Sequence, residues 1–485
     1  MKFPEYLRYL ISSRGLNVSE VARMTHVERS TLSRAVNGAR LPKWNVVSQV
    51  SDCLRLTPDE AYKLRAYYNE IAMGEDAYRV RERVMDLILD LCSPKSSSGR
   101  HMTASDRANA FAREGFMIGQ VDVQAVMRSV IREAEQSTDA HVLMSMPPDN
   151  KEYLNWLSDE CRAANGIRIE HLVYYKISRD ESVSNVLNGL DILEYALEMM
   201  LADGNNYHPF FLYSDGAHTT DALPNVIVTD RRLLRISDDY TRAELSSNPE
   251  AIQYYRFHIT QLKAVCRPFI KFQYNPMDMM RDYSAVNAGV ACQPIMNHPC
   301  TGQYITEEII KSAMYENLPG YDTIYKMAVQ YFDGLAKSAP KNTSFFTETG
   351  VKDFLKTGVI SDVPSGVSRP LQPAYRREII GRLIEDIRND HVSAWLIDET
   401  MLSIPPNLTI GTSEYPVAVF FSKQIAEQNT PYFSTIVTER FIAQALYDFM
   451  INLTSSQFVR SREETLACLQ RCLDEEPMIE ESTPG

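Results

Sequence analysis

Residues 29 to 34 place two arginines and three hydroxyl side chains within six positions: Arg29, Ser30, Thr31, Ser33 and Arg34. An arginine can donate two parallel hydrogen bonds to one guanine, and hydroxyl groups suit base edges and phosphates. A helix needs none of these residues in order to pack, whereas Leu32, Ala35 and Val36 are spaced as its buried side. The pattern therefore predicts a helix that turns polar groups suited to nucleic acid away from its own core.

Residues 29–34 must be positioned by the helices around them. The sequence of residues 1 to 70 predicts several short helices from local patterns. Apolar residues recur at helical spacing, with capping residues before the helices and glycine or proline between them. The expected elements are a helix from Phe3 to Gly15, a second after the N-cap Asn17, a third from Glu28 to Asn37, a fourth from Pro42, and a fifth after the capping box Thr57-Pro58-Asp59-Glu60. Five short helices in this space predict a compact all-α head.

Residues 3–68 resemble the Cro/repressor (XRE, lambda-repressor-like) helix-turn-helix family. The residues that carry the resemblance are Ala22, His26, Val27, Leu32 and the exit Asn37, Gly38 and Pro42. The chain departs from the family at the turn, where His26 replaces glycine, and at the third helix's cap, where Glu28 replaces serine. Histidine tolerates a positive φ better than most residues, so we expect the turn to form; Glu28 places an acid near the phosphates and weakens binding slightly.

This resemblance implies that the third helix lies in the major groove of double-stranded operator DNA, bound by a homodimer. The implied base-reading residues are Arg29, Ser30, Ser33 and Arg34. The implied phosphate-contacting residues, at the exit of the helix, are Asn37, Arg40 and Lys43. An alternative is that Arg29 and Arg34 only form a solvated face.

The charge distribution agrees with a DNA-binding head. The 485 residues carry a formal charge of -13, yet residues 1–68 hold eleven Lys/Arg against six Asp/Glu. A basic head on an acidic body is typical of nucleic-acid-binding chains, although chance also produces so modest an excess. Without a membrane-length apolar run or an export signal, and with eight scattered cysteines, we expect a cytoplasmic protein with no membrane partner.

Beyond the head, the predicted organisation is a multidomain α/β chain. The expected segments are 71–101, a connector helix and flexible linker; 102–270, a first α/β sensor-like unit with a mixed sheet; 271–370, a loop-rich helical insert; and 371–485, a shortened second copy with an acidic tail. The repeat rests on HPFFLYSD and NVIVTDRR, which resemble YPVAVFFSK and STIVTERF. A chance match of β-rich strings is the alternative.

The body offers no recognisable catalytic set. It weakly resembles phospholipase D-like sensor domains, but no histidine has the lysine two positions on that the chemistry of that family needs. No phosphate-binding glycine loop occurs. Cys292, His298 and Cys300 lack a fourth zinc ligand, and Cys468 and Cys472 are spaced for helix packing. We therefore expect no enzyme activity, no cofactor and no metal.

The sequence thus predicts a sequence-specific transcriptional regulator whose body senses a signal, dimerises, or both. A small-molecule or peptide effector fits this reading, and its pocket is unknown. Aromatic residues near strand ends are mostly core, with a minority available to line such a pocket: Tyr174, Tyr175, Phe210, Phe211, Tyr213, Phe420 and Phe421. Two alternatives are a DNA-tethered effector enzyme and a protein-binding scaffold.

Overall fold

A computed structural model describes residues 1–92, 114–137, 140–147, 167–176, 182–203, 207–214, 224–273, 275, 278–279, 281, 292–338, 342–360, 363, 366–404, 406, 408–413, 417–422 and 433–475. The chain forms two compact units, Met1–Arg83 and Val84–Gly485. The first extends beyond the expected boundary at residue 70, because the division falls inside helix α6 (Glu75–Cys92). The linker expected at residues 93–99 lies outside the described residues. Among the described helices, none combines the length and apolar character that a membrane crossing requires.

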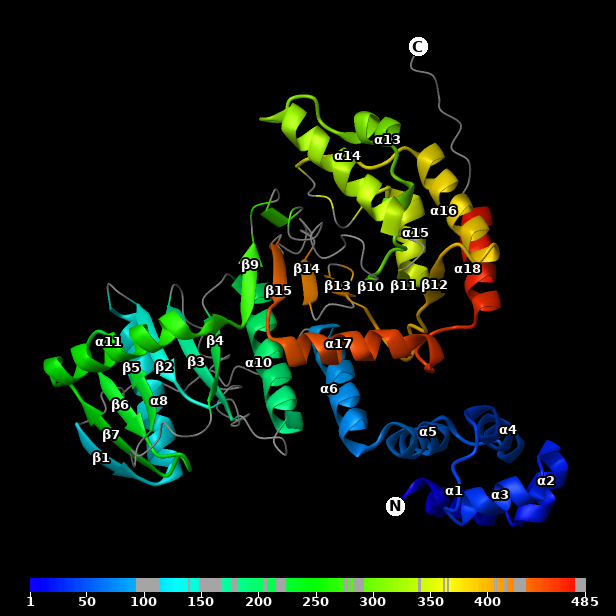
Figure 1. Cartoon of the computed structure of the whole chain (residues 1–485), viewed down its shortest axis with the longest axis horizontal. Helices are drawn as coiled ribbons and strands as arrows, with labels where there is room; N and C mark the ends of the chain where they lie inside the picture. Colours follow the sequence, from blue (N-terminus) through cyan, green and yellow to red (C-terminus); the bar gives the residue numbers. More distant parts are fainter. Residues whose placement is uncertain are drawn as a thin grey trace, which may run out of the picture. The chain divides into compact units, whose positions relative to one another are not determined.

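The first unit is all-helical, as predicted (Figure 1). Its helices, besides the first part of α6, are α1 (Phe3–Ser13), α2 (Val18–Thr25), α3 (Arg29–Val36), α4 (Trp44–Leu54) and α5 (Pro58–Met73). One core joins them, with side chains such as Phe3, Leu10, Val21, Leu32 and Val50 fully or almost fully buried. The five helices of the head therefore follow the capping and periodicity signals closely.

The second unit is a mixed α/β body. Its strands are β1 (Gly115–Ile118), β2 (His141–Ser145), β3 (Arg168–Lys176), β4 (Tyr207–Ser214), β5 (Asn225–Val228), β6 (Leu233–Ile236), β7 (Arg242–Ser246), β8 (Arg267–Pro268), β9 (Ile270–Gln273), β10 (Cys292–Ile295), β11 (Thr343–Phe346), β12 (Ser393–Leu396), β13 (Leu408–Ser413), β14 (Val417–Ser422) and β15 (Phe433–Val437). Its helices are α8 (Gln120–Glu135), α10 (Ser182–Asp203), α11 (Pro249–Val265), α13 (Glu307–Ala313), α14 (Tyr321–Ser338), α15 (Glu348–Thr357), α16 (Pro373–Arg388), α17 (Arg440–Asn452) and α18 (Arg462–Glu475).

The described strands form two sheets. Sheet A has the order β1-β7-β6-β5-β2-β3-β4-β8, and sheet B has the order β12-β11-β10-β13-β14-β15-β9. In each sheet three neighbouring strands are parallel, β2-β3-β4 and β10-β11-β12. Three antiparallel strands continue from them, β5-β6-β7 and β13-β14-β15, and an earlier strand closes the edge, β1 or β9. One topology therefore occurs twice, over residues 115–268 and 270–437.

The expected repeat matched strands that are not equivalent in the two sheets. HPFFLYSD forms β4 in a parallel set, whereas the string aligned with it forms β14 in an antiparallel set. Segment 271–370 is not an insert, because it supplies three strands of sheet B, β9, β10 and β11. The alignment failed because buried strands of similar composition look alike wherever they lie in a sheet.

Helices cover both sheets. Helix α11 packs on sheet A through Ile252 and Ile259, which contact a cluster that includes Leu143 and Val228. In Figure 1, α13 to α16 and α18 lie together beside sheet B, and their apolar side chains share one core. Helix α15 is fixed at its start, where the Thr347 hydroxyl donates to the carbonyl oxygen of Asn297 at 3.0 Å.

Replacing Gly350 by alanine should destabilise the second unit. A Cβ there would lie 1.8 Å from the carbonyl oxygen of Asn297, so α15 would have to move. We expect a loss of about 1–3 kcal/mol in urea unfolding followed by circular dichroism. Gly381→Ala is the matched control, because that helical glycine has no atom within 4 Å of an added Cβ. It should be neutral or stabilise the protein by up to about 1 kcal/mol, and equal losses in both variants would contradict the explanation.

Candidate nucleic-acid interface and body pocket

The turn between α2 and α3 has the geometry that the sequence predicted. The Asn17 side chain caps α2 by accepting from the amides of Ser19 and Glu20, at 3.0 and 3.1 Å. His26 ends the helix in the left-handed conformation, with φ 55° and ψ 23°. The histidine therefore supplies the positive φ for which a glycine is more usual.

Helix α3 divides into a buried and an exposed side. Leu32, Ala35 and Val36 are buried, with Leu32 only 1% exposed. Arg29, Ser30 and Arg34 are exposed, and Ser33 is half-buried. The structure thus brings the four predicted base-reading residues onto one short helix, with the two arginines free of core packing.

Glu28, the departure from the expected serine cap, changes the start of α3. Its side chain makes no capping hydrogen bond to the helix. It instead accepts from the Ser30 hydroxyl at 3.2 Å. A predicted base-reading hydroxyl is therefore partnered by a carboxylate that DNA binding would have to accommodate.

The exit of α3 carries the predicted phosphate contacts. Asn37, Arg40 and Lys43 are all exposed, and Gly38 takes a positive φ of 73°. Arg8, which sequence reasoning missed, donates from α1 to the carbonyl oxygen of Val36 at 2.8 Å and to the Asn37 side-chain oxygen at 3.4 Å. Because the Asn37 side-chain oxygen accepts from Arg8, the NH2 group of the same amide points away from the Arg8 guanidinium. No local pattern marks Arg8, since its partners lie 28 and 29 residues away.

An aromatic cluster fixes the loop that follows. The Tyr68 hydroxyl donates to the carbonyl oxygen of Pro42 at 2.9 Å, and its ring lies edge-on to Trp44 and Phe3. The guanidinium of Arg65 stacks 4.3 Å from the Trp44 ring centre, and burial lowers the pKa of Arg65. Lys43 therefore follows a proline whose carbonyl is held by α5.

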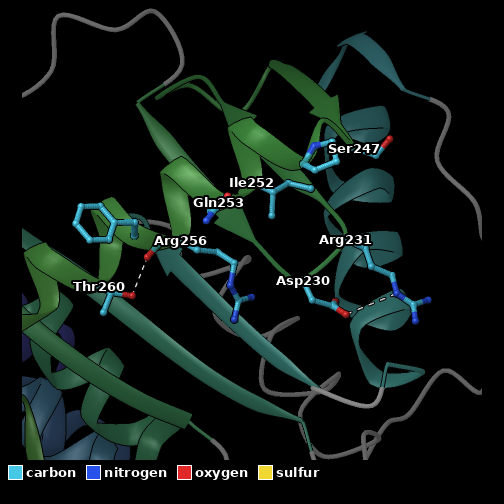
Figure 2. A pocket seen from close by; sticks show the side chains of 9 residues that line it. Asp230, Arg231, Ser247, Ile252, Gln253, Arg256 and Thr260 are labelled. Carbon is cyan, nitrogen blue, oxygen red and sulfur yellow. Dashed lines mark hydrogen bonds and ion pairs between the residues drawn. The ribbon is translucent and has the colours of Figure 1, made fainter.

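The body contains an open hollow of about 750 Å³ (Figure 2). Its lining residues are Asp230, Arg231, Ser247, Pro249, Ile252, Gln253, Arg256, Phe257 and Thr260. Arg231 comes from the turn after β5 and pairs with Asp230 at 3.6 Å, while Arg256 comes from α11. Asp230 also accepts from Ser137 at 2.6 Å. The Thr260 hydroxyl donates to the carbonyl oxygen of Arg256 at 2.7 Å, as Figure 2 shows. Two guanidinium groups, the Ser247 hydroxyl and the exposed Phe257 ring suit an anion with an apolar part.

Among the residues whose side chains the structure describes, those suspected of binding zinc or an effector do not line this hollow. His298 is buried, and its Nδ1 donates to the carbonyl oxygen of Pro299 at 2.7 Å. The Cys292 side chain lies outside the described atoms, as do the side chains of Phe420 and Phe421. Tyr175 and Phe211 are buried in the core, as most of the strand-end aromatics were predicted to be.

Comparisons with known proteins identify the head. Residues 5–64 match the model of a family described as a helix-turn-helix domain, which confirms the predicted head. No curated protein matches the chain.

Three solved structures that resemble the chain have low TM-scores. A structure titled as TrmBL2, an archaeal chromatin protein with a novel mode of DNA binding, has a TM-score of 0.22 at 10% identity, over 51% of this chain and 93% of that one. Phosphatidylserine synthase from Haemophilus influenzae Rd KW20 has 0.24 at 8%, over 76% and 96%. Polyphosphate kinase from Porphyromonas gingivalis has 0.19 at 11%, over 72% and 53%. Scores this low do not assign a function to the body.

The ion pair between Arg14 and Glu60 should make the head sensitive to acid. Arg14 donates to Glu60 at 2.8 Å, and this hydrogen bond holds the pKa of Glu60 at about 2, below its ordinary 4.5. A lowered folded pKa stabilises the fold above the ordinary value, and the stabilisation is lost as the pH falls from 4.5 toward 2. We expect amide hydrogen exchange in α1 and α5 of the full chain, corrected for intrinsic rates, to rise over this range. In Glu60→Gln the rise should be smaller, whereas Glu70→Gln on the same helix should behave as wild type; identical acid responses in all three would refute this role.

Proposed function

We propose that this protein is a transcriptional regulator that binds operator DNA sequence-specifically as a homodimer. The observation that carries the proposal is the exposed polar face of α3, which holds Arg29, Ser30 and Arg34 beside the buried Leu32 and Ala35. In helix-turn-helix domains the N-terminal residues of this helix meet base edges in the major groove. Arg29 is the first residue of α3, so its guanidinium is the best placed to reach a guanine.

The charge distribution supports specific rather than indiscriminate binding. The head is basic, and the remaining 417 residues carry an excess of acids. An acidic body is repelled by phosphates, so it limits non-specific electrostatic binding to the head. Asn37, Arg40 and Lys43 would fix the register of the head on the backbone, leaving base discrimination to α3.

We also propose that the body senses an anionic effector in the Figure 2 hollow and does so without catalysis. Arg231, Arg256 and Ser247 supply the donors for a carboxylate or phosphate. Phe257, 64% exposed, supplies an apolar face. A DNA-tethered enzyme is the alternative that substrate turnover would favour. A scaffold is favoured instead if a protein partner binds and no metabolite does.

Selection of binding sites from random duplex DNA with the full chain tests the regulator. We expect a two-fold symmetric site with half-site centres about one helical turn apart. Arg29→Ala should weaken binding to that site by about 1–3 kcal/mol and relax its sequence at one position of each half-site. Fluorescence anisotropy with matched and mismatched duplexes measures both effects.

Two further variants separate base reading from phosphate contact. Lys43→Ala should weaken binding to all sequences alike and lower the salt slope by about one. Lys63→Ala removes the same charge from α5, where it pairs with Asp59 at 2.7 Å, and should leave the selected site unchanged. If the wild type and Arg29→Ala bind every duplex equally, with only salt setting the affinity, the head is a non-specific tether.

A thermal-shift screen with phosphorylated and carboxylate metabolites tests the effector pocket. A ligand of this class should raise the melting temperature, because it binds the folded state only. Arg256→Met should abolish the shift, since a methionine keeps much of the apolar stem but removes the charge. Arg267→Met, an arginine outside the hollow, is the control; a shift that survives Arg256→Met places the ligand elsewhere.

A further inference from the structure

Three side-chain atoms of the kinds that bind metals lie close together in the second unit. They are the thiols of Cys468 and Cys472 on α18 and a carboxylate oxygen of Glu348 in the first turn of α15, all within 4.8 Å of one another. Among the described residues, these three side chains form a group that could hold a metal ion. We propose that it binds a thiophilic divalent cation of the zinc class.

The spacing of the ligands fits one ion. Residues four apart share a helix face, so α18 presents both thiols to the same point. With Zn–S near 2.3 Å and Zn–O near 2.0 Å, the ligands of a tetrahedral ion lie about 3.5–3.8 Å apart. The Cys468 sulfur is 3.5 Å from the Glu348 oxygen. Little movement is therefore needed for these two atoms to share an ion.

Both helices are held in place before any ion binds. The start of α15 is capped by Thr347, whose hydroxyl accepts from the Gly350 amide at 2.9 Å and donates to Asn297. Helix α18 is joined to strand β12 by the Thr465 hydroxyl, which accepts from the Leu396 amide at 3.2 Å. The site is thus preorganised by contacts with sheet B rather than by the ligands themselves.

One side of the three-ligand cluster is exposed to solvent. Cys468 and Cys472 are each 2% exposed, whereas the Glu348 side chain is 32% exposed. An ion would reach the thiols past the carboxylate, and a water on that side would complete a tetrahedral set of three protein ligands. This open fourth position distinguishes the site from closed structural zinc centres.

Two cations hold Glu348 in the absence of an ion. Lys352 pairs with one carboxylate oxygen at 2.7 Å, and Arg471 with the other at 2.8 Å. Arg471 also lies 3.7 Å from the Cys468 sulfur. An ion must take a Glu348 oxygen from one of them, so these side chains compete with it. Because binding releases two thiol protons in exchange for a divalent ion, the formal charge of the cluster does not change.

Titration of the reduced full chain with Zn²⁺ against a chromophoric chelator tests the site, and it needs no DNA. We expect one ion per chain, release of protons on binding, and thiolate charge-transfer bands with Co²⁺ as the probe. Cys468→Ser and Cys472→Ser should lose the ion, while Cys53→Ser, a half-buried thiol in the first unit, should keep it. Glu348→Gln should weaken binding by at least about ten- to a hundredfold, the loss typical of an outer-shell partner, because Glu348 is proposed as a ligand itself.

Arg471→Met separates a metal site from a packing contact. It removes the competing cation without touching a ligand, so the affinity for Zn²⁺ should rise rather than fall. This variant and Glu348→Gln leave the buried thiols intact, so they remain informative if the serine variants fold poorly. No bound ion in the wild type, or binding that persists in both cysteine variants when they are folded, overturns the proposal. Because the readout is metal alone, it fails or succeeds independently of operator binding.

Discussion

Burial of one narrow apolar strip on α3 is the constraint on which the head depends. The helix has eight residues and no side-chain cap at its start, so it would be marginal in isolation. Leu32, Ala35 and Val36 hold it to the core, and Arg8 ties down the carbonyl of Val36. The same burial orients Arg29 and Arg34 outward, because a helix that packs on one side must expose the other. The stability of the head and the proposed recognition of DNA therefore depend on opposite sides of the same helix.

The head could be predicted from sequence because its signals are local. Asn17, Gly38 and the Thr57 capping box each act within a few residues, and the structure uses all three. The body could be predicted only as α/β, since strand order depends on partners far apart in the chain. Strand β9 pairs with β15 across more than 160 residues, and no local pattern in IKFQ indicates it. The sequence indicated two copies of an α/β unit, but the similar strings form strands at non-equivalent positions in the two sheets.

The candidate sites divide in the same way. Arg29, Ser30, Ser33 and Arg34 were found because consecutive turns of one helix bring them together. Arg231 and Arg256 line the same hollow only because β5 and α11 pack on each other, and the sequence does not indicate that packing. Cys468 and Cys472 were correctly expected on one helix face, yet packing alone looked sufficient. The third member, Glu348, lies 120 residues from Cys468, so only the fold could supply it.

If the body binds a signal, as proposed, that signal can change DNA binding only if its affinity differs between two states of the chain. If a ligand changes operator affinity by some factor, the operator must change the ligand's affinity by the same factor. Helix α6 is the covalent route between the units, and Val84, Leu87 and Ile88 in its second part are fully buried. Close-packed side chains resist small continuous shifts, so that part of α6 can move only by repacking. A useful effector must therefore favour one of two discrete packings, and a ligand that binds both equally would leave the operator unaffected.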